Sequence, residues 1–271
     1  MPPRSHCSQG IVVDHHLPMD GRAVRARQVA RAGHPPVSHG FAALGVYTAG
    51  RARVELAGEW RVGVGDVLLV PAGSAHRLLA AEGAEYWGLA LWAPSARAAA
   101  SGLVDPFERV RDGGAAVVSI PAARQAFLES LLQELAQASG PPAVRESLVT
   151  LVLGEVQRAL GPPSGAPGLV SASLGYIERH ALRPLTVAEV AEAVGRTPTH
   201  LTTALRRATG RTVTAWITLT RLAEARRLLQ QTALGVEDVA ERVGYGDATH
   251  FIRMFRRHHG ATPAAWRAAA G

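Results

Sequence analysis

The sequence contains no lysine, so all 29 of its basic residues are arginine. Cysteine is nearly absent as well: Cys7 is alone, which excludes a disulfide within the chain and fits a reducing cytoplasm. No apolar run approaches the roughly 18 residues that a membrane span needs, and the opening MPPRSHCSQG lacks the apolar stretch of a secretion signal. We therefore expect a cytoplasmic protein with no membrane partner.

The net charge of +7 is unevenly distributed along the chain. Residues 169–271 hold 14 arginines and 8 acidic residues, a net +6, whereas residues 1–168 hold 15 arginines and 14 acidic residues, a net +1. The apolar fraction of 47% is that of an ordinary globular protein, and 271 residues leave room for two domains. Because guanidinium groups suit phosphate oxygens and guanine edges, the asymmetry indicates a near-neutral module joined to one that binds anions.

Changes in composition divide the chain into four parts. Residues 1–120 form the first part, and within it residues 11–92 contain short alternating runs separated by glycines, as in RVELAGEWRVGVGDVLLVPAG, which is the pattern of β-hairpins. Residues 121–160 change to a helical period, and residues 161–168, GPPSGAPG, have the composition of a linker. We expect a multidomain α+β protein in which a small β-barrel or sandwich, a helical segment and a linker precede a helical domain at 169–271.

The helical segment at 121–160 has two apolar stripes. The run RQAFLESLLQELAQ places the first on one face, at Phe127, Leu128, Leu131, Leu132 and Leu135. The run VRESLVTLVLGEVQRAL carries the second, at Leu148, Leu151, Val152 and Val156. Two interpretations remain open: the stripes cover an open face of the β domain, or they pair with a second copy of the chain to make a homodimer.

Residues 169–271 contain an internal repeat. The segment VAEVAEAVG at 187–195 recurs 49 positions later as VEDVAERVG at 236–244, and the offset then becomes 50 after one extra residue. Each copy predicts a short helix, a glycine turn and a second helix. This is the organisation of a helix-turn-helix.

Capping residues support the predicted helix starts. Thr186 and Glu189 have the spacing of a capping box, and Thr197-Pro198 supplies a cap followed by a proline at the first helical position. In the second copy, Asp247 precedes the helix that contains FIRMFRRHH. Such a run of charged residues usually belongs to a solvent-exposed helix without a binding partner. That explanation would also have to account for the basic residues at the same positions in the other copy of the repeat.

The segment RLAEARRLLQQTALGVEDVAERVGYGDATHFIRMFRRHHGATPAAWR resembles the signature of the AraC/XylS family of bacterial transcription regulators, and the resemblance extends over about residues 169–268. It implies two helix-turn-helix units, bridged by a long helix from Val213 to Gln231, that insert their second helices into adjacent major-groove segments of double-stranded DNA. RNA polymerase is a further candidate partner.

The same resemblance assigns roles to individual residues. The base contacts implied for the two reading helices are Thr199, Thr202 and Thr203, then Ala248, Thr249, Ile252 and Arg253. The arginines better suited to phosphates are Arg206, Arg207, Arg256 and Arg257. The chain has Thr202-Thr203 where the family often has a long polar side chain, which predicts weak base readout by the first helix. We expect His200 and His250 to be half-buried packing residues.

The β domain carries a motif of its own. Residues Gly65 to His76, GDVLLVPAGSAH, fit the second cupin motif and resemble the sensor domain found ahead of this DNA-binding module, over about residues 24–92. The resemblance implies a cupin-like barrel that binds a small-molecule effector. The candidate effector-binding residues are His39, Tyr47, His76 and Trp87.

An enzymatic alternative follows from the same motif. Metal-dependent cupins use two histidines and a glutamate before it, but His34 and His39 are five residues apart and Ala42-Ala43 occupies the expected carboxylate region. The sequence has no G-x-S-x-G motif and no P-loop. We expect a non-enzymatic, effector-controlled regulator without metal or cofactor. The alternatives are a metal-dependent cupin enzyme with an appended DNA-binding domain, and an architectural DNA-binding protein without an effector.

Overall fold

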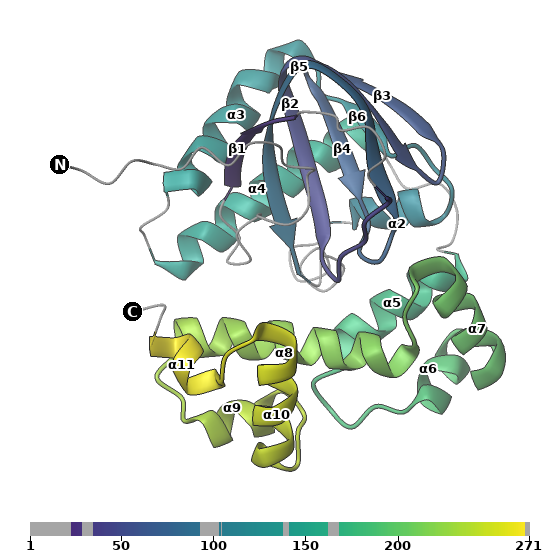
Figure 1. The fold of residues 1–271 in the computed structure, drawn as a ribbon, viewed down its shortest axis with the longest axis vertical. Helices are drawn as coiled ribbons and strands as arrows, with labels where there is room; N and C mark the ends of the chain where they lie inside the picture. Colours follow the sequence, from purple (N-terminus) through teal and green to yellow (C-terminus); the bar gives the residue numbers. More distant parts are fainter. Residues whose placement is uncertain are drawn as a thin grey trace. The chain divides into compact units, whose positions relative to one another are not determined.

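Figure 1 shows the fold, a computed structural model that describes residues 23–28, 35–92, 103, 105–137, 141–161 and 168–268. Contacts divide the chain into one unit formed by Met1–Leu91 with Ser101–Gly165 and another formed by Trp92–Ala100 with Ala166–Gly271. Among the described residues, every helix is too short or too polar to cross a membrane. Cys7, His34 and most of the expected linker lie outside the described residues.

The first unit is built on a six-stranded antiparallel sheet. Its strands are β1 (Ala23–Arg27), β2 (Ala42–Leu56), β3 (Glu59–Gly63), β4 (Asp66–Val70), β5 (His76–Leu91) and β6 (Val117–Ser119). The strand order is β1-β5-β2-β4-β6, and β3 pairs with the second half of β2. Register shifts between Tyr47 and Val54 interrupt the β2–β5 pairing. Such bulges bend a strand, and the sheet curves strongly (Figure 1).

The predicted hairpins are present. The β2–β3 turn has positive φ at Ala57 and Gly58, and the cupin-like motif forms β4, a turn with Gly73 at φ 81°, and the start of β5. The fold class expected from the sequence is therefore confirmed: a sheet-rich N-terminal domain precedes a helical C-terminal domain.

Among its described residues, the first unit also contains the helices α2 (Pro106–Arg111), α3 (Ala122–Gln137) and α4 (Pro142–Leu160). Helices α3 and α4 pack against each other, α3 against β1 and α4 against β6 (Figure 1). Arg124 joins them through hydrogen bonds of 2.6 and 2.9 Å to the carboxylate of Glu155, and these bonds lower the pKa of that carboxyl.

Most side chains of the apolar stripes of α3 and α4 are buried within the protomer. Their buried members are Leu128, Leu131, Leu132, Leu135, Val149, Val152, Leu153 and Val156. The stripe containing Leu131 and Leu135 thus covers the β domain, which is the first of the two interpretations. Val144 and Leu151 on α4 are instead 51% and 49% exposed.

The second unit contains seven helices in the described range 168–268. They are α5 (Leu169–His180), α6 (Val187–Ala193), α7 (Pro198–Thr209), α8 (Val213–Gln231), α9 (Val236–Arg242), α10 (Ala248–His259) and α11 (Pro263–Ala268). The predicted bridging helix has the expected bounds. Its second half packs Leu222 and Leu229 into a core with Phe251 and Phe255, while Val213 and Trp216 are buried in its first half.

Candidate DNA-binding surface

The first helix-turn-helix consists of α6, a turn at Gly195, and α7. Thr186 and Glu189 form the expected capping box, in which the Glu189 amide donates to Thr186 Oγ1 at 3.2 Å and the Thr186 amide to the Glu189 carboxylate at 2.9 Å. Gly195 has φ 64°, a conformation that glycine adopts readily. The Thr197 side chain then caps α7 through the amide of His200, so α6 and α7 both start where the sequence indicated.

Two buried leucines set the orientation of α7. Leu201 and Leu205 are fully buried, which leaves Thr199 and Thr203 exposed and Thr202 partly exposed. The proposed base-reading threonines of the first unit therefore lie at the surface.

The second helix-turn-helix follows the same plan. The Asp247 carboxylate accepts from the amides of Thr249 and His250, at 2.8 and 3.3 Å, and starts α10. Phe251 and Phe255 are fully buried. The opposite face of α10 presents Thr249, Ile252 and Arg253 to solvent, with Ala248 partly exposed.

Helices α7 and α10 each carry a pair of arginines in the last turn. Arg206, Arg207, Arg256 and Arg257 are exposed, and none of the four has a carboxylate partner in the described part of the chain. Each helix then stops at a left-handed glycine, Gly210 or Gly260. Four positive charges without carboxylate partners at equivalent places in a repeat are suited to phosphate contacts.

The two histidines of these helices depart from the prediction, because His200 and His250 are both exposed. Each histidine precedes a buried residue, Leu201 or Phe251, and successive helical side chains point about 100° apart, so both histidines turn away from the core. The imidazole of His250 reaches only the edge of the core. There it lies 5.6 Å from the Tyr245 ring, and its Nδ1 is 3.0 Å from Arg253 Nη2. His250 thus holds a proposed base-reading side chain.

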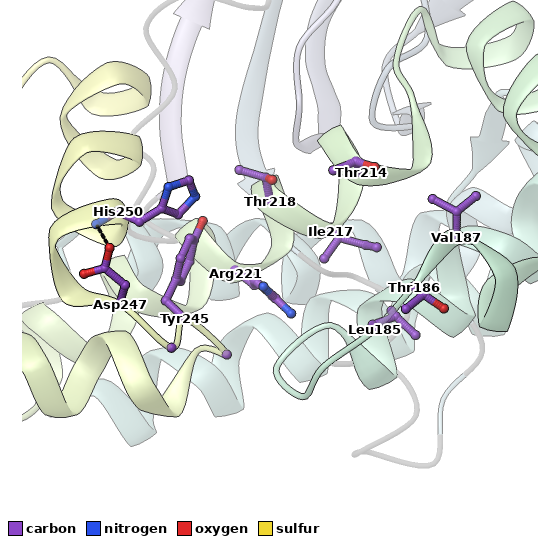
Figure 2. Close-up of a pocket in the computed structure, with 12 residues that line it drawn as sticks. Leu185, Thr186, Val187, Thr214, Ile217, Thr218, Arg221, Tyr245, Asp247 and His250 are labelled. Carbon is purple, nitrogen blue, oxygen red and sulfur yellow. Dashed lines mark hydrogen bonds between the residues drawn. The ribbon is translucent and has the colours of Figure 1, made fainter.

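A groove of about 680 Å³ separates the two helix-turn-helix units. As Figure 2 shows, Leu185, Thr186 and Val187 at the start of α6 form one side, and Tyr245, Asp247 and His250 form the other. Helix α8 lies between them and contributes Thr214, Ile217, Thr218 and Arg221.

Sequence reasoning missed Arg221, Tyr245 and this groove. One signal was available in the sequence: the two copies of the repeat differ directly after the turn glycine, where the first copy has Arg196 and the second has Tyr245.

The structure separates the candidate effector-binding residues of the β domain. His39 and His76 are buried, with ring centroids 5.1 Å apart. Tyr47 is also buried, and its hydroxyl donates to Gln28 at 2.9 Å. Trp87 points elsewhere. Tyr47 pairs with Tyr86 across β2 and β5, and successive residues alternate faces, so Trp87 lies on the opposite face of the sheet, 3.5 Å from the Glu129 carboxylate of α3.

Among the described residues, no group of three or more His, Cys, Asp or Glu side chains is arranged to hold a metal ion. His39 and His76 are near each other, and no third ligand joins them in the described range.

Comparisons with known proteins match both parts of the chain. The family described as the AraC-like ligand binding domain matches residues 21–151, and a family described as a helix-turn-helix domain matches residues 190–269. The transcriptional activator NphR from Rhodococcus sp is 39% identical over 83 residues, 31% of this chain and 24% of that protein. The HTH-type transcriptional regulator YpdC from Escherichia coli (strain K12) is 35% identical over 86 residues, 32% of this chain and 30% of that protein.

These matches span less than a third of the length of either relative. Among solved structures, the C-terminal domain of AraT, a response regulator from Geobacillus stearothermophilus, is 29% identical with a TM-score of 0.37; the match covers 39% of this chain and 88% of that one.

Proposed function

Because the chain belongs to the AraC/XylS family, with an AraC-like ligand-binding domain ahead of its helix-turn-helix domain, we propose that it is a transcription regulator controlled by a small-molecule effector. One observation carries the DNA-binding part: two repeated helix-turn-helix units each expose a reading helix that ends in two arginines without carboxylate partners in the described range. We take its target to be double-stranded DNA and its location to be the cytoplasm.

In this proposal α7 and α10 enter adjacent major-groove segments, about one helical turn apart. The base contacts come from Thr199, Thr202 and Thr203 on α7, and from Ala248, Thr249, Ile252 and Arg253 on α10. The phosphate contacts come from Arg206, Arg207, Arg256 and Arg257. Of the base-reading side chains, Arg253 has the largest capacity for discrimination, since a guanidinium can donate two hydrogen bonds to one guanine.

The effector site belongs to the β domain, residues 1–120, in this proposal. His39, His76 and Tyr47 are its candidates, because they are buried polar side chains on the strands and connections of the sheet. Trp87 is a weaker candidate on account of its position under α3.

The remaining segments of the chain supply the dimer contact, the linker and the DNA-binding domain in this proposal. Residues 121–160 supply a homodimer contact through the exposed face of α4, residues 161–168 act as the linker, and residues 169–271 bind DNA. RNA polymerase is the partner through which DNA binding would change transcription. The apolar exposure of Val144 and Leu151 supports the α4 contact.

Two measurements test the function. Selection from a random duplex pool should yield a specific binding sequence, and a thermal-shift screen against sugars, aromatic acids and metals should identify a stabilising compound. That compound should then change the affinity for the selected duplex. If no compound changes it, the architectural alternative is favoured. If purified protein carries one tightly bound iron or manganese per chain and turns over a substrate, the enzymatic alternative is favoured.

A further inference from the structure

Arg221 connects the two helix-turn-helix units. It lies in the middle of α8, where its Nε donates to the Ala181 carbonyl at 2.7 Å and its Nη2 donates to the Arg183 carbonyl at 2.9 Å. Both carbonyls belong to the segment that follows α5. Ala181 is the C-cap of α5, and a carbonyl at a helix end has no partner within the helix, so the first of these bonds stabilises the end of α5.

The same guanidinium also contacts the second unit. Its Cζ lies 5.5 Å from the ring centroid of Tyr245, which belongs to the core that contains Phe251 and Phe255. Burial raises the pKa of Tyr245 and lowers that of Arg221. Two carbonyls and an aromatic face therefore surround the Arg221 cation, which is a suitable environment for a planar guanidinium.

Gly244 makes a second contact between the units. A Cβ at this position would lie 2.8 Å from the Leu182 carbonyl oxygen and 3.1 Å from Arg221 Cζ. Its counterpart in the first unit, Gly195, also has positive φ but has open space around it. The close approach is therefore not a requirement of the helix-turn-helix turn. It is specific to the place where the second unit meets the first.

These contacts lie beside the groove that separates the start of α6 from the start of α10 (Figure 2). Elsewhere along the groove, the lining side chains at the start of α6 stand apart from Asp247 and His250 at the start of α10, with α8 between them (Figure 2). A hinge at α8 would therefore open or close the groove, unless the Arg221 contacts prevent that movement.

We propose that Arg221, with Tyr245 and Gly244, forms a joint that fixes the distance and angle between α7 and α10 and so determines the spacing of the two DNA segments that the protein recognises. Arg221 is a positioning residue, since it acts through the two reading helices. The consequence for DNA rests on the proposed function. The rigidity of the joint can be measured without DNA.

Lysine cannot replace Arg221 in this joint. A planar guanidinium can donate to two carbonyls while its face lies against an aromatic ring, and an ammonium group has neither the fork nor the plane. Arg227 provides the matched control. It lies on the same helix, carries the same charge and pairs with Glu224 at 2.6 Å, three residues away along α8. Loss of Arg227 removes one charge from α8 without touching the joint.

The first experiment measures the distance between the units in the full chain. Spin labels are attached at Glu192→Cys and Glu241→Cys, which are exposed and equivalent in the repeat, in a Cys7→Ser background. The wild-type chain and Arg227→Ala should give one narrow distance distribution, whereas Arg221→Lys and Arg221→Ala should give a broader one. A distribution that is equally narrow in a folded Arg221→Lys chain would overturn the proposal.

The second experiment measures spacing preference on DNA. The selected duplex is compared with the same duplex carrying one base pair inserted between its two recognised segments, an insertion that rotates one segment by about 35°. Wild type and Arg227→Ala should prefer the selected duplex by at least about tenfold, and Arg221→Lys should lose most of that preference.

A general loss of stability would weaken binding to both duplexes in proportion, so an unchanged ratio for Arg221→Lys also overturns the proposal. If the wild-type chain binds no duplex specifically, the proposed function fails, and the spin-label result still decides whether the joint exists.

Discussion

At the scale of single residues, contacts within α10 hold the candidate base reader Arg253. The Asp247 carboxylate holds the backbone of His250, and the ring of His250 in turn faces Arg253 Nη2 at 3.0 Å. A side chain that is ordered before binding loses less conformational entropy when it binds. In the proposed function, His250 therefore contributes to base reading indirectly, because its ring contacts Arg253 on the exposed face of α10.

Arg253 and Arg256 should differ in what their loss does to DNA binding. Arg253→Ala should flatten sequence preference at one or two positions, a loss of about 1–3 kcal/mol of discrimination, and barely change non-specific binding. Arg256→Ala should weaken binding to all sequences and reduce the slope of log affinity against log salt by about 1. Titrations of both variants on selected and scrambled duplexes at several salt concentrations measure this. Equal weakening of both duplexes by Arg253→Ala would make Arg253 a phosphate contact.

The two turn glycines allow a matched stability test. Gly195→Ala should cost about 1–2 kcal/mol, because alanine is strained at φ 64° and the added methyl group meets open space. Gly244→Ala should cost about 1–3 kcal/mol more, because its methyl group would overlap the Leu182 carbonyl oxygen. Urea unfolding of both variants gives the comparison. Equal costs would mean that the backbone near Leu182 gives way without penalty.

His259 should make stability fall in mild acid. Burial, then the charges of Arg226 and His258, lower its pKa to about 4. Between pH 6.5 and 4 the unfolded chain therefore takes up a proton that the folded chain refuses, and stability decreases as the pH falls through this window. The loss is about 2 kcal/mol after allowance for the partly exposed ring. Urea unfolding at pH 7.5 and 5 should show a smaller loss for His259→Phe than for wild type; identical losses would exclude this role.

At the scale of elements, the sequence predicted features that depend on residues close together in the chain better than contacts between distant residues. Thr186 and Glu189 cap α6 as expected, because both partners of that capping box lie within four residues of each other. The contacts of Arg221 join residues 38 and 40 positions apart, and no periodicity marks such a pair. The stripe at Leu131 and Leu135 was predicted as apolar, but only the packing of α3 on β1 and α4 decides what covers it.

The exposed face of α4 allows a test of the dimer. Val144 and Leu151 are seven residues apart, so they lie on one face of the helix two turns from each other. Val144→Asp with Leu151→Asp should convert a dimer to monomers in sedimentation and leave the circular dichroism unchanged. Leu131→Asp with Leu135→Asp should unfold the domain instead, because these side chains are 6% and 0% exposed. A double α4 variant that remains dimeric would place the interface elsewhere.

At the scale of the whole molecule, the two units have separate cores. The second unit buries Leu174 and Ile177 of α5, Leu201 and Leu205 of α7, and Phe251 and Phe255 of α10. All six of these core residues lie within residues 169–271, so we expect this range to fold as a domain of its own.

Deletion of residues 1–168 should therefore leave a soluble domain that binds the selected duplex and no longer responds to the effector. Circular dichroism and a duplex titration with and without the stabilising compound check both parts. If residues 169–271 fail to fold, the proposed boundary is wrong; if the fragment still responds, the effector site lies outside the β domain.

Helix α8 places a geometric limit on how this protein can evolve. Its first half is built into the first helix-turn-helix and its second half into the second, so one inserted residue would turn the second helix-turn-helix by about 100° and advance it by about 1.5 Å. In the proposed complex, that rotation would carry α10 out of phase with the major-groove segment next to the one that α7 enters. An insertion or deletion in α8 should thus disrupt recognition of both DNA segments unless it restores the helical phase. We therefore expect new binding sequences to arise mainly from substitutions on the exposed faces of α7 and α10.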